Sequence, residues 1–201
     1  MKIDTLHSRD FGTNTYIISS SDFSILIDPA ISFDDLSECY QKSLKMVFLT
    51  HGHYDHFSQI ASFKGRGLTF YMHQNAYEKM LDPFKNFSYA LEYDYKEDLK
   101  GEKIVFVTGG EVITTPVGDV SVLELFGHTD CSVGYLINND LFSGDVIFSE
   151  GIGRCDLYSG DIKVMKETLE RIKSFPNYNV YPGHGGITTI KGFFLNNYYF
   201  Y

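Results

Sequence analysis

Residues 45–56, KMVFLTHGHYDH, decide the fold and the chemistry expected of this chain. The first six residues form a short, mostly apolar run that predicts a buried strand. Residues two apart in an extended segment point the same way, so His51 and His53 can face one metal ion directly after that strand. Asp55 and His56 stand where the next helix is expected to begin and would point to a second, neighbouring position. Four residues of metal-ligand type within six positions favour a metal site.

Three later stretches repeat one local design, in which a strand is followed by glycine and then by a residue of metal-ligand type. They are residues 125–128 (LFGH), 142–145 (FSGD) and 181–184 (YPGH), which add His128, Asp145 and His184. Glycine at that point lets the chain turn sharply and aim the next side chain inward. Each residue alone has a simpler explanation, as a hydrogen-bonded core histidine or a turn aspartate. Together with residues 51–56 they predict one metal centre at the strand ends, for zinc or else for iron or manganese.

The composition excludes several classes of protein. The chain has 201 residues and a formal net charge of −9, and no repeat, low-complexity tract or linker divides it, so we expect one domain over residues 1–201. The acidic balance argues against a nucleic-acid partner. Cys39, Cys131 and Cys155 are far apart and form no pairing pattern, which favours reduced thiols in the cytoplasm. Without an apolar leader, or an apolar run near the ~20 residues that cross a bilayer, we expect no membrane partner.

Short strands and helices alternate along the chain. We expect strands over residues 1–8, 14–19, 24–28, 45–50, 68–72, 103–107, 112–114, 120–126, 133–138, 141–143 and 178–181. We expect helices over residues 33–43, 56–63, 74–81 and 161–173, and a last helix from 188. Residues 82–100 mix aromatic and charged side chains without a clear period, and predict either a lid or pocket wall or a helical excursion on the surface. Strands in each half, with helices between and after them, indicate an α+β protein of two mixed sheets packed face to face.

These motifs resemble the metallo-β-lactamase superfamily, and within it the glyoxalase II-like (hydroxyacylglutathione hydrolase-like) subgroup. The resemblance runs from about residue 11 to residue 190 and rests on short motifs spread along the chain. They are residues 50–56 (THGHYDH), 127–129 (GHT), 143–148 (SGDVIF), 182–185 (PGHG) and 188–190 (TTI). Residues 151–157 (GIGRCDL), with Gly160-Asp161, are similar to a segment that glyoxalase II-like enzymes share with persulfide dioxygenases.

The resemblance implies a four-layer αβ/βα sandwich and a role for each site residue. His51, His53 and His128 would hold a first metal ion, Asp55, His56 and His184 a second, and Asp145 would bridge the two. Arg154 would bind a substrate carboxylate, with a surface salt bridge as the alternative role. His7 and His73 match no ligand position and are expected to be structural.

The sequence departs from the family pattern at two places. Asp130-Cys131 stand where the family often has Pro-Gly after Gly-His-Thr. Near the C-terminus, Phe193 and Asn197-Tyr198 replace a glutamate and a later Asn-Pro pair. Larger glyoxalase II enzymes also add a helical domain that binds glutathione, for which this chain has no room.

We therefore expect a binuclear metal-dependent hydrolase that cleaves an acyl thioester of a small-molecule substrate by metal-bound hydroxide. Asp55 would both ligate a metal and orient the hydroxide, and a thiolate leaves without a strong general acid. One alternative is a mononuclear-iron persulfide dioxygenase on His51, His128 and Asp145. Another is a non-catalytic metal-binding protein, although seven ligands for two metals leave open positions, unlike a closed structural site. Lactam hydrolysis is disfavoured, because two-metal β-lactamases commonly lack a bridging carboxylate at the position of Asp145.

Overall fold

A computed structural model describes residues 1–91 and 95–197 of the chain. Residues 92–94 of the stretch 82–100, and Tyr198 in the C-terminal departure, lie outside the described residues. None of the helices in the described part is long and apolar enough to cross a membrane.

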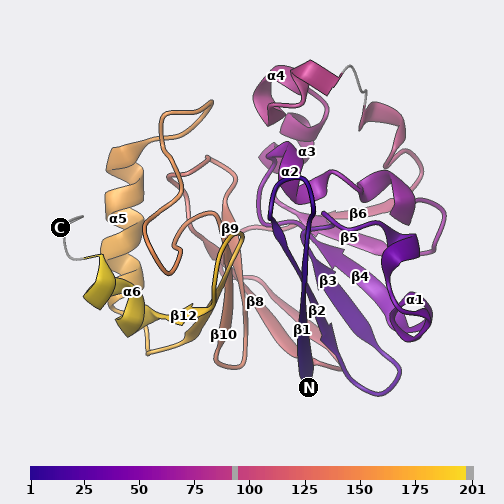
Figure 1. Cartoon of the computed structure of the whole chain (residues 1–201), viewed down its shortest axis with the longest axis horizontal. Coiled ribbons are helices and arrows are strands. Elements are labelled where there is room, and N and C mark those ends of the chain that lie inside the picture. The colour runs from indigo at the N-terminus through magenta and orange to yellow at the C-terminus, as the bar shows by residue number, and fades with distance from the viewer. Residues whose placement is uncertain (92–94, 198–201) are drawn as a thin grey trace.

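Two six-stranded mixed sheets form the centre of the molecule (Figure 1). The first has the order β1 (Lys2–His7), β2 (Asn14–Ser19), β3 (Ser24–Ile27), β4 (Leu44–Phe48), β5 (Thr69–Met72) and β6 (Lys103–Phe106). The second has the order β12 (Thr188–Thr189), β11 (Asn179–Pro182), β10 (Asp140–Gly144), β9 (Val133–Ile137), β8 (Gly118–Glu124) and β7 (Val112–Thr115). In the first sheet β3 to β6 run parallel, and in the second only β10 and β11 do.

Three apolar clusters show that the layers are stacked as a four-layer sandwich. Alternate residues of one strand face opposite sides, so Ile18 packs between the sheets while its neighbour Ile17 packs against the helices of the first half. The third cluster joins the outer face of the second sheet to α5 (Ile162–Lys173) and α6 (Ile190–Asn196), which Figure 1 shows on that side. The expected fold is therefore confirmed.

Two predicted helices are interrupted. In place of one helix over 33–43 there is a 3-10 turn, Phe33–Asp35, and a helix α1 (Glu38–Ser43). Leu36 between them has an extended backbone and is buried in the core beside the first sheet. The expected helix 56–63 starts earlier, as α2 (Tyr54–Phe57), and resumes as a 3-10 turn, Ile60–Phe63. The backbone N–H of Gln59 donates to the carbonyl of Pro29 at this break, so a tertiary contact replaces a helical one.

The segment after α3 (Gln74–Met80) is a run of short helical pieces. It contains α4 (Pro83–Asn86) and the 3-10 turns Tyr89–Leu91 and Tyr95–Glu97. Phe87 and Tyr89 of this segment line a cavity, described below, so the described part of residues 82–100 is both a helical excursion and a pocket wall.

Candidate metal centre

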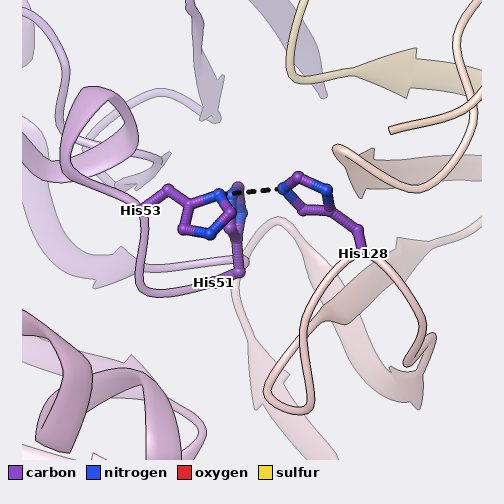
Figure 2. A group of neighbouring side chains, drawn as sticks. All are labelled: His51, His53 and His128. Carbon is purple, nitrogen blue, oxygen red and sulfur yellow. Dashed lines mark hydrogen bonds between the residues drawn. The ribbon is translucent and has the colours of Figure 1, made fainter. Parts of the chain in front are cut away.

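The seven predicted ligand residues lie together where strands of both sheets end. His51 and His53 follow β4, and Asp145 and His184 come directly after β10 and close behind β11. Figure 2 shows the imidazoles of His51, His53 and His128 directed toward one another from the two halves of the chain. Nε2 of His128 lies 2.9 Å from Nδ1 of His53. Residues more than seventy positions apart in the sequence therefore share one small volume.

The ligand atoms fall into three overlapping groups, in each of which all atoms lie within 4.8 Å of one another. The groups are His51, His53 and His128; His51, His56 and Asp145; and Asp55, His56 and His184. The first and last groups match the two sets that the family resemblance implied. The middle group contains Asp145 with one member of each set, which is the place that a bridging carboxylate would take.

Glycine is required at the strand ends that carry these residues. Gly127 has φ +135 and Gly144 has φ +52, a region in which other residues are strained. Gly183 serves in another way, because a Cβ there would lie 2.2 Å from Oδ1 of Asp145 and 2.6 Å from Cε1 of His56. The interpretation of the Gly-ligand pairs as sharp turns is confirmed at the first two, and at the third the need is for close packing.

Buried polar atoms without partners point into the centre. Nε2 of His51, His53 and His56 and Oδ1 of Asp145 are buried and make no hydrogen bond. A buried polar atom left unpaired costs about 1–3 kcal/mol, so four such atoms facing one space call for a shared partner. Imidazole nitrogen and carboxylate oxygen are donors that a divalent cation of the zinc type prefers. The residues present therefore fit a metal site.

The electrostatics favour the same conclusion. Burial lowers the pKa of His51 and brings that of His53 to about 3, so both imidazoles are neutral with a lone pair to donate. At His56, burial acts to lower the pKa, but the carboxylates of Asp145, Asp55 and Asp28 outweigh it and raise the pKa. Negative charge thus gathers around one imidazole, and a cation would balance it.

Asp28 is a functional residue that sequence reasoning missed. Its Oδ2 lies 2.8 Å from Nδ1 of His56 and accepts a hydrogen bond from the hydroxyl of Thr50, while its Oδ1 accepts one from the backbone N–H of Thr50. A carboxylate on the far nitrogen of a metal-binding imidazole fixes its orientation and raises its basicity. The only sequence signal was its place at the end of the expected strand over residues 24–28, followed by Pro29, which says nothing of a metal centre.

His128 is oriented by a backbone group instead. Its Nδ1 lies 2.7 Å from the carbonyl oxygen of Arg154. Since a carbonyl only accepts, Nδ1 carries the proton and Nε2 is left with its lone pair. The backbone at Gly153 packs closely against that of Asp145: an added Cβ at Gly153 would lie 1.8 Å from the carbonyl oxygen of Asp145.

The side chain of Arg154 lies at the surface, 63% exposed, and both Nε and Nη2 donate to the Asp156 carboxylate at 2.8 Å. The guanidinium is thus held in the surface salt bridge that was the alternative role, although Arg154 also lines the cavity over the metal centre.

The remaining expectations concern residues outside the centre. His7 bonds to Asn14, and Nδ1 of His73 accepts a hydrogen bond from Asn75 at the start of α3. Asp130 pairs with Lys79, whose side chain is 4% exposed, and thus ties the loop after His128 to α3. Cys131 beside it is fully buried. Phe193, which replaces the glutamate of the family pattern near the C-terminus, is part of the apolar core beside α5.

A cavity of about 620 Å³ opens over the metal centre. Its floor is formed by ligand residues, among them His53, Asp55 and His184. A volume of this size accommodates a small organic molecule.

Comparison with known proteins agrees with this geometry. The sequence pattern of the metallo-beta-lactamase superfamily matches residues 8–184. A probable polyketide biosynthesis zinc-dependent hydrolase, PksB, from Bacillus subtilis is 26% identical over 99% of this chain and 87% of its own length. Hydroxyacylglutathione hydrolase 1 from Vibrio vulnificus is 31% identical over 87% of this chain, which spans only 62% of that enzyme. The crystal structure of the BLEG-1 B3 metallo-beta-lactamase superimposes with a TM-score of 0.83, at 25% identity and over 99% of both chains.

Proposed function

Because the chain belongs to the metallo-beta-lactamase superfamily, we propose that it is a hydrolase with two divalent cations, of zinc, that cleaves an acyl thioester of a small-molecule substrate. The observation that carries this proposal is the set of linked ligand groups around Asp145. A mononuclear site would need only one group, whereas Asp55, His56 and His184 form a complete second one. Two of the similar proteins support the choice of metal and of bond, since one is named a zinc-dependent hydrolase and the other a hydroxyacylglutathione hydrolase.

When bound, two such cations lower the pKa of a coordinated water and polarise a substrate carbonyl. The chain's own residues then have three tasks. His51, His53, Asp55, His56, His128, Asp145 and His184 hold the cations. Asp28 and the carbonyl of Arg154 keep two of the imidazoles in position. The apolar side chains that line the cavity, among them Phe11, Tyr54 and Phe87, contact the substrate.

Asp55 is our candidate for orienting the attacking water. Its Oδ2 accepts a hydrogen bond from the hydroxyl of Thr13 and lies 3.1 Å from Nε2 of His184. Burial acts to raise the pKa of this carboxyl, but the neighbouring His56 and His184 outweigh burial and lower it, so the carboxylate is ionised and can accept a hydrogen bond from the attacking water. A thiolate is a stable leaving group near neutral pH, so the reaction needs no second proton donor.

Arg154 is our candidate for binding a carboxylate on the thiol portion of the substrate. The side chain stands at the rim and is paired with Asp156. A substrate carboxylate would have to replace Asp156, so the net gain in binding is small.

The test uses purified full-length protein. Metal content per chain is measured by mass spectrometry, and turnover is measured with a hydroxyacyl-glutathione, a neutral-thiol thioester, a penicillin-type lactam and a persulfide. We expect about two metal ions per chain and turnover of thioesters only. A single iron with oxygen uptake on the persulfide would establish the dioxygenase instead. Lactam turnover without thioester turnover, or no turnover by fully metallated protein, would equally overturn the proposal.

A further inference from the structure

The wall of the cavity over the metal centre is aromatic. Above the ligand residues it is lined by Phe11, Tyr54, Phe87, Tyr89, Phe148 and Leu157. Phe11 packs edge to face on Tyr54, with ring centroids 5.4 Å apart. Phe11 is 46% exposed and Tyr89 is 58% exposed. Large apolar side chains that stay open to solvent around a cavity mark a surface that binds an apolar group.

Phe87, in this wall, has a strained backbone conformation. It has φ 67 and ψ 22, the left-handed conformation, just after α4. Residues other than glycine are strained in this conformation, and strained residues are frequent at functional sites. The fully buried amide of Asn86 holds the turn, because its Nδ2 donates to the carbonyl of Met80 and its Oδ1 accepts from the N–H of Ser88.

The ring of Phe87 is placed directly beside the metal centre. It meets the imidazole of His53 edge to face, with centroids 5.1 Å apart. Glycine would adopt this backbone conformation without strain. A phenyl group in that position instead supplies apolar surface next to a ligand residue, where the reacting end of a substrate would lie.

Positive charge is scarce in the cavity. Among the described residues that line it, only Arg154 carries a permanent positive charge, and Asp156 already neutralises it. Asp55 and Asp145 contribute negative charge at the floor. Outside the metal ions themselves, therefore, the wall has little with which to recognise an anionic acyl group.

We propose that the acyl group of the substrate is apolar, an aryl or medium-chain alkyl group that lies against the wall formed by Phe11, Tyr54, Phe87 and Tyr89. This inference rests on the proposed thioester hydrolysis and names the class of acyl group for that reaction. Water attacks the thioester carbonyl, the carbon–sulfur bond breaks, and the products are the apolar carboxylic acid and the free thiol.

The experiment compares thioesters that share one neutral thiol, N-acetylcysteamine, and differ in the acyl group: acetyl, butanoyl, octanoyl, phenylacetyl and succinyl. With metal-loaded full-length protein, kcat/KM should rise about 10- to 100-fold from acetyl to octanoyl or phenylacetyl, because each buried methylene adds binding energy. The succinyl thioester, whose acyl group is charged, should be among the poorest substrates. Equal rates for all acyl groups, or a preference for succinyl, would overturn the inference while leaving the thioesterase in place.

A binding measurement distinguishes a failure of the proposed thioester hydrolysis from a failure of the proposed apolar site. Octanoate, phenylacetate and acetate share the carboxylate, so calorimetric titration of the metal-loaded protein isolates the contribution of the apolar part. Octanoate and phenylacetate should bind at least about 10-fold more tightly than acetate. If no thioester is cleaved but this preference is present, the proposed reaction fails and the apolar site stands. If the three acids bind equally, the apolar site is refuted whatever the activity.

Phe87→Gly is the decisive variant, because it removes the ring without placing another side chain in the left-handed conformation, and its fold should be retained. We expect the ratio of octanoyl to acetyl kcat/KM to fall about 5- to 10-fold. Phe106→Ala is the matched control: Phe106 is 46% exposed on β6, packs against Tyr77 and does not line the cavity. Its ratio should equal that of the parent protein. A folded Phe87→Gly protein with an unchanged ratio would show that the ring does not contact the acyl group.

Discussion

Oδ2 of Asp28 lies 2.8 Å from Nδ1 of His56, and both side chains are buried. The same oxygen accepts a hydrogen bond from the hydroxyl of Thr50, and Oγ1 of Thr50 lies 3.1 Å from Nδ1 of His51. One carboxylate, directly after β3, therefore orients one imidazole directly and a second through Thr50. His51 also belongs to the group with His53 and His128, and His56 to the group with Asp55 and His184, so Asp28 connects the two halves of the metal centre.

Asp28→Ala should lower the affinity for metal without removing any ligand. Partners of this kind typically contribute 10- to 100-fold to affinity, and we expect a loss of about that size. The measurement is competition with a chromophoric chelator, followed at both binding steps. Asp34→Ala, at a side chain that is 77% exposed, is the matched control and should bind metal as the parent does. Unchanged affinity in folded Asp28→Ala would mean that the His56 ring is fixed by packing alone.

Asp145→Ala should deplete metal at both positions, whereas His184→Ala should deplete mainly one. Asp145 lies 3.2 Å from Nε2 of His56 and 3.8 Å from Nε2 of His128, one from each of the two outer groups, whereas His184 is grouped only with Asp55 and His56. Metal content after dialysis distinguishes the variants: we expect the His184 variant to retain about one ion and the Asp145 variant less. If Asp145→Ala retains both ions, the carboxylate does not bridge them.

Removing metal should destabilise the fold. Without cations, the buried carboxylates and imidazoles of the centre lack their partner, and any ligand that binds only the folded state stabilises it by mass action. At free metal about 1,000 times the Kd, this linkage amounts to about 4 kcal/mol per site. Thermal unfolding with and without a chelator should therefore show a lower Tm for the stripped protein, and readdition of metal should restore it. Identical unfolding curves would indicate that the centre does not bind metal at the concentrations used.

Much of this site could be predicted because its ligand residues occur in short sequence motifs. The run KMVFLT before His51 indicated a buried strand, and β4 with the ligand loop after it occupies that place. Gly127 and Gly144 indicated sharp turns at strand ends, which the structure has. Such features depend on neighbours in sequence, so one sequence suffices to find them.

What could not be predicted depends on contacts between distant segments. Leu36 interrupts the expected helix over 33–43 because it packs into the core, and Gln59 interrupts the next one by bonding to Pro29. Asp28 gave no local sign of its role, since its partner His56 lies 28 positions away. Arg154 was singled out for its side chain, and nothing in the sequence indicated that its backbone carbonyl contacts His128.

Gly153→Ala should lower metal content, although residue 153 is not a ligand. An added Cβ would lie 1.8 Å from the carbonyl oxygen of Asp145 and 2.9 Å from Nδ1 of His128, and a backbone atom cannot rotate away. The loop must therefore shift, and the carbonyl of Arg154 leaves His128. Gly186→Ala is the matched control, because an added Cβ there meets nothing within 4 Å. Metal content by mass spectrometry should fall in the first variant only, and equal content in both would show that the loop adapts without cost.

Arg154→Ala separates the side chain of this residue from its backbone. The carbonyl that orients His128 remains in the variant, so metal content and Tm should stay at the parent values. If the guanidinium binds a carboxylate on the thiol portion, kcat/KM for a glutathione thioester should fall. A dedicated charge-assisted hydrogen bond is worth ~1.5–3 kcal/mol, or ~10- to 100-fold. Because the guanidinium is 63% exposed and must first leave Asp156, we expect a smaller loss, about 3- to 10-fold, carried by KM. The same acyl group on a neutral thiol should be hydrolysed as by the parent protein. An equal loss on both thioesters would assign Arg154 to the structure of the loop, and no loss on either would leave it as a surface salt bridge with Asp156.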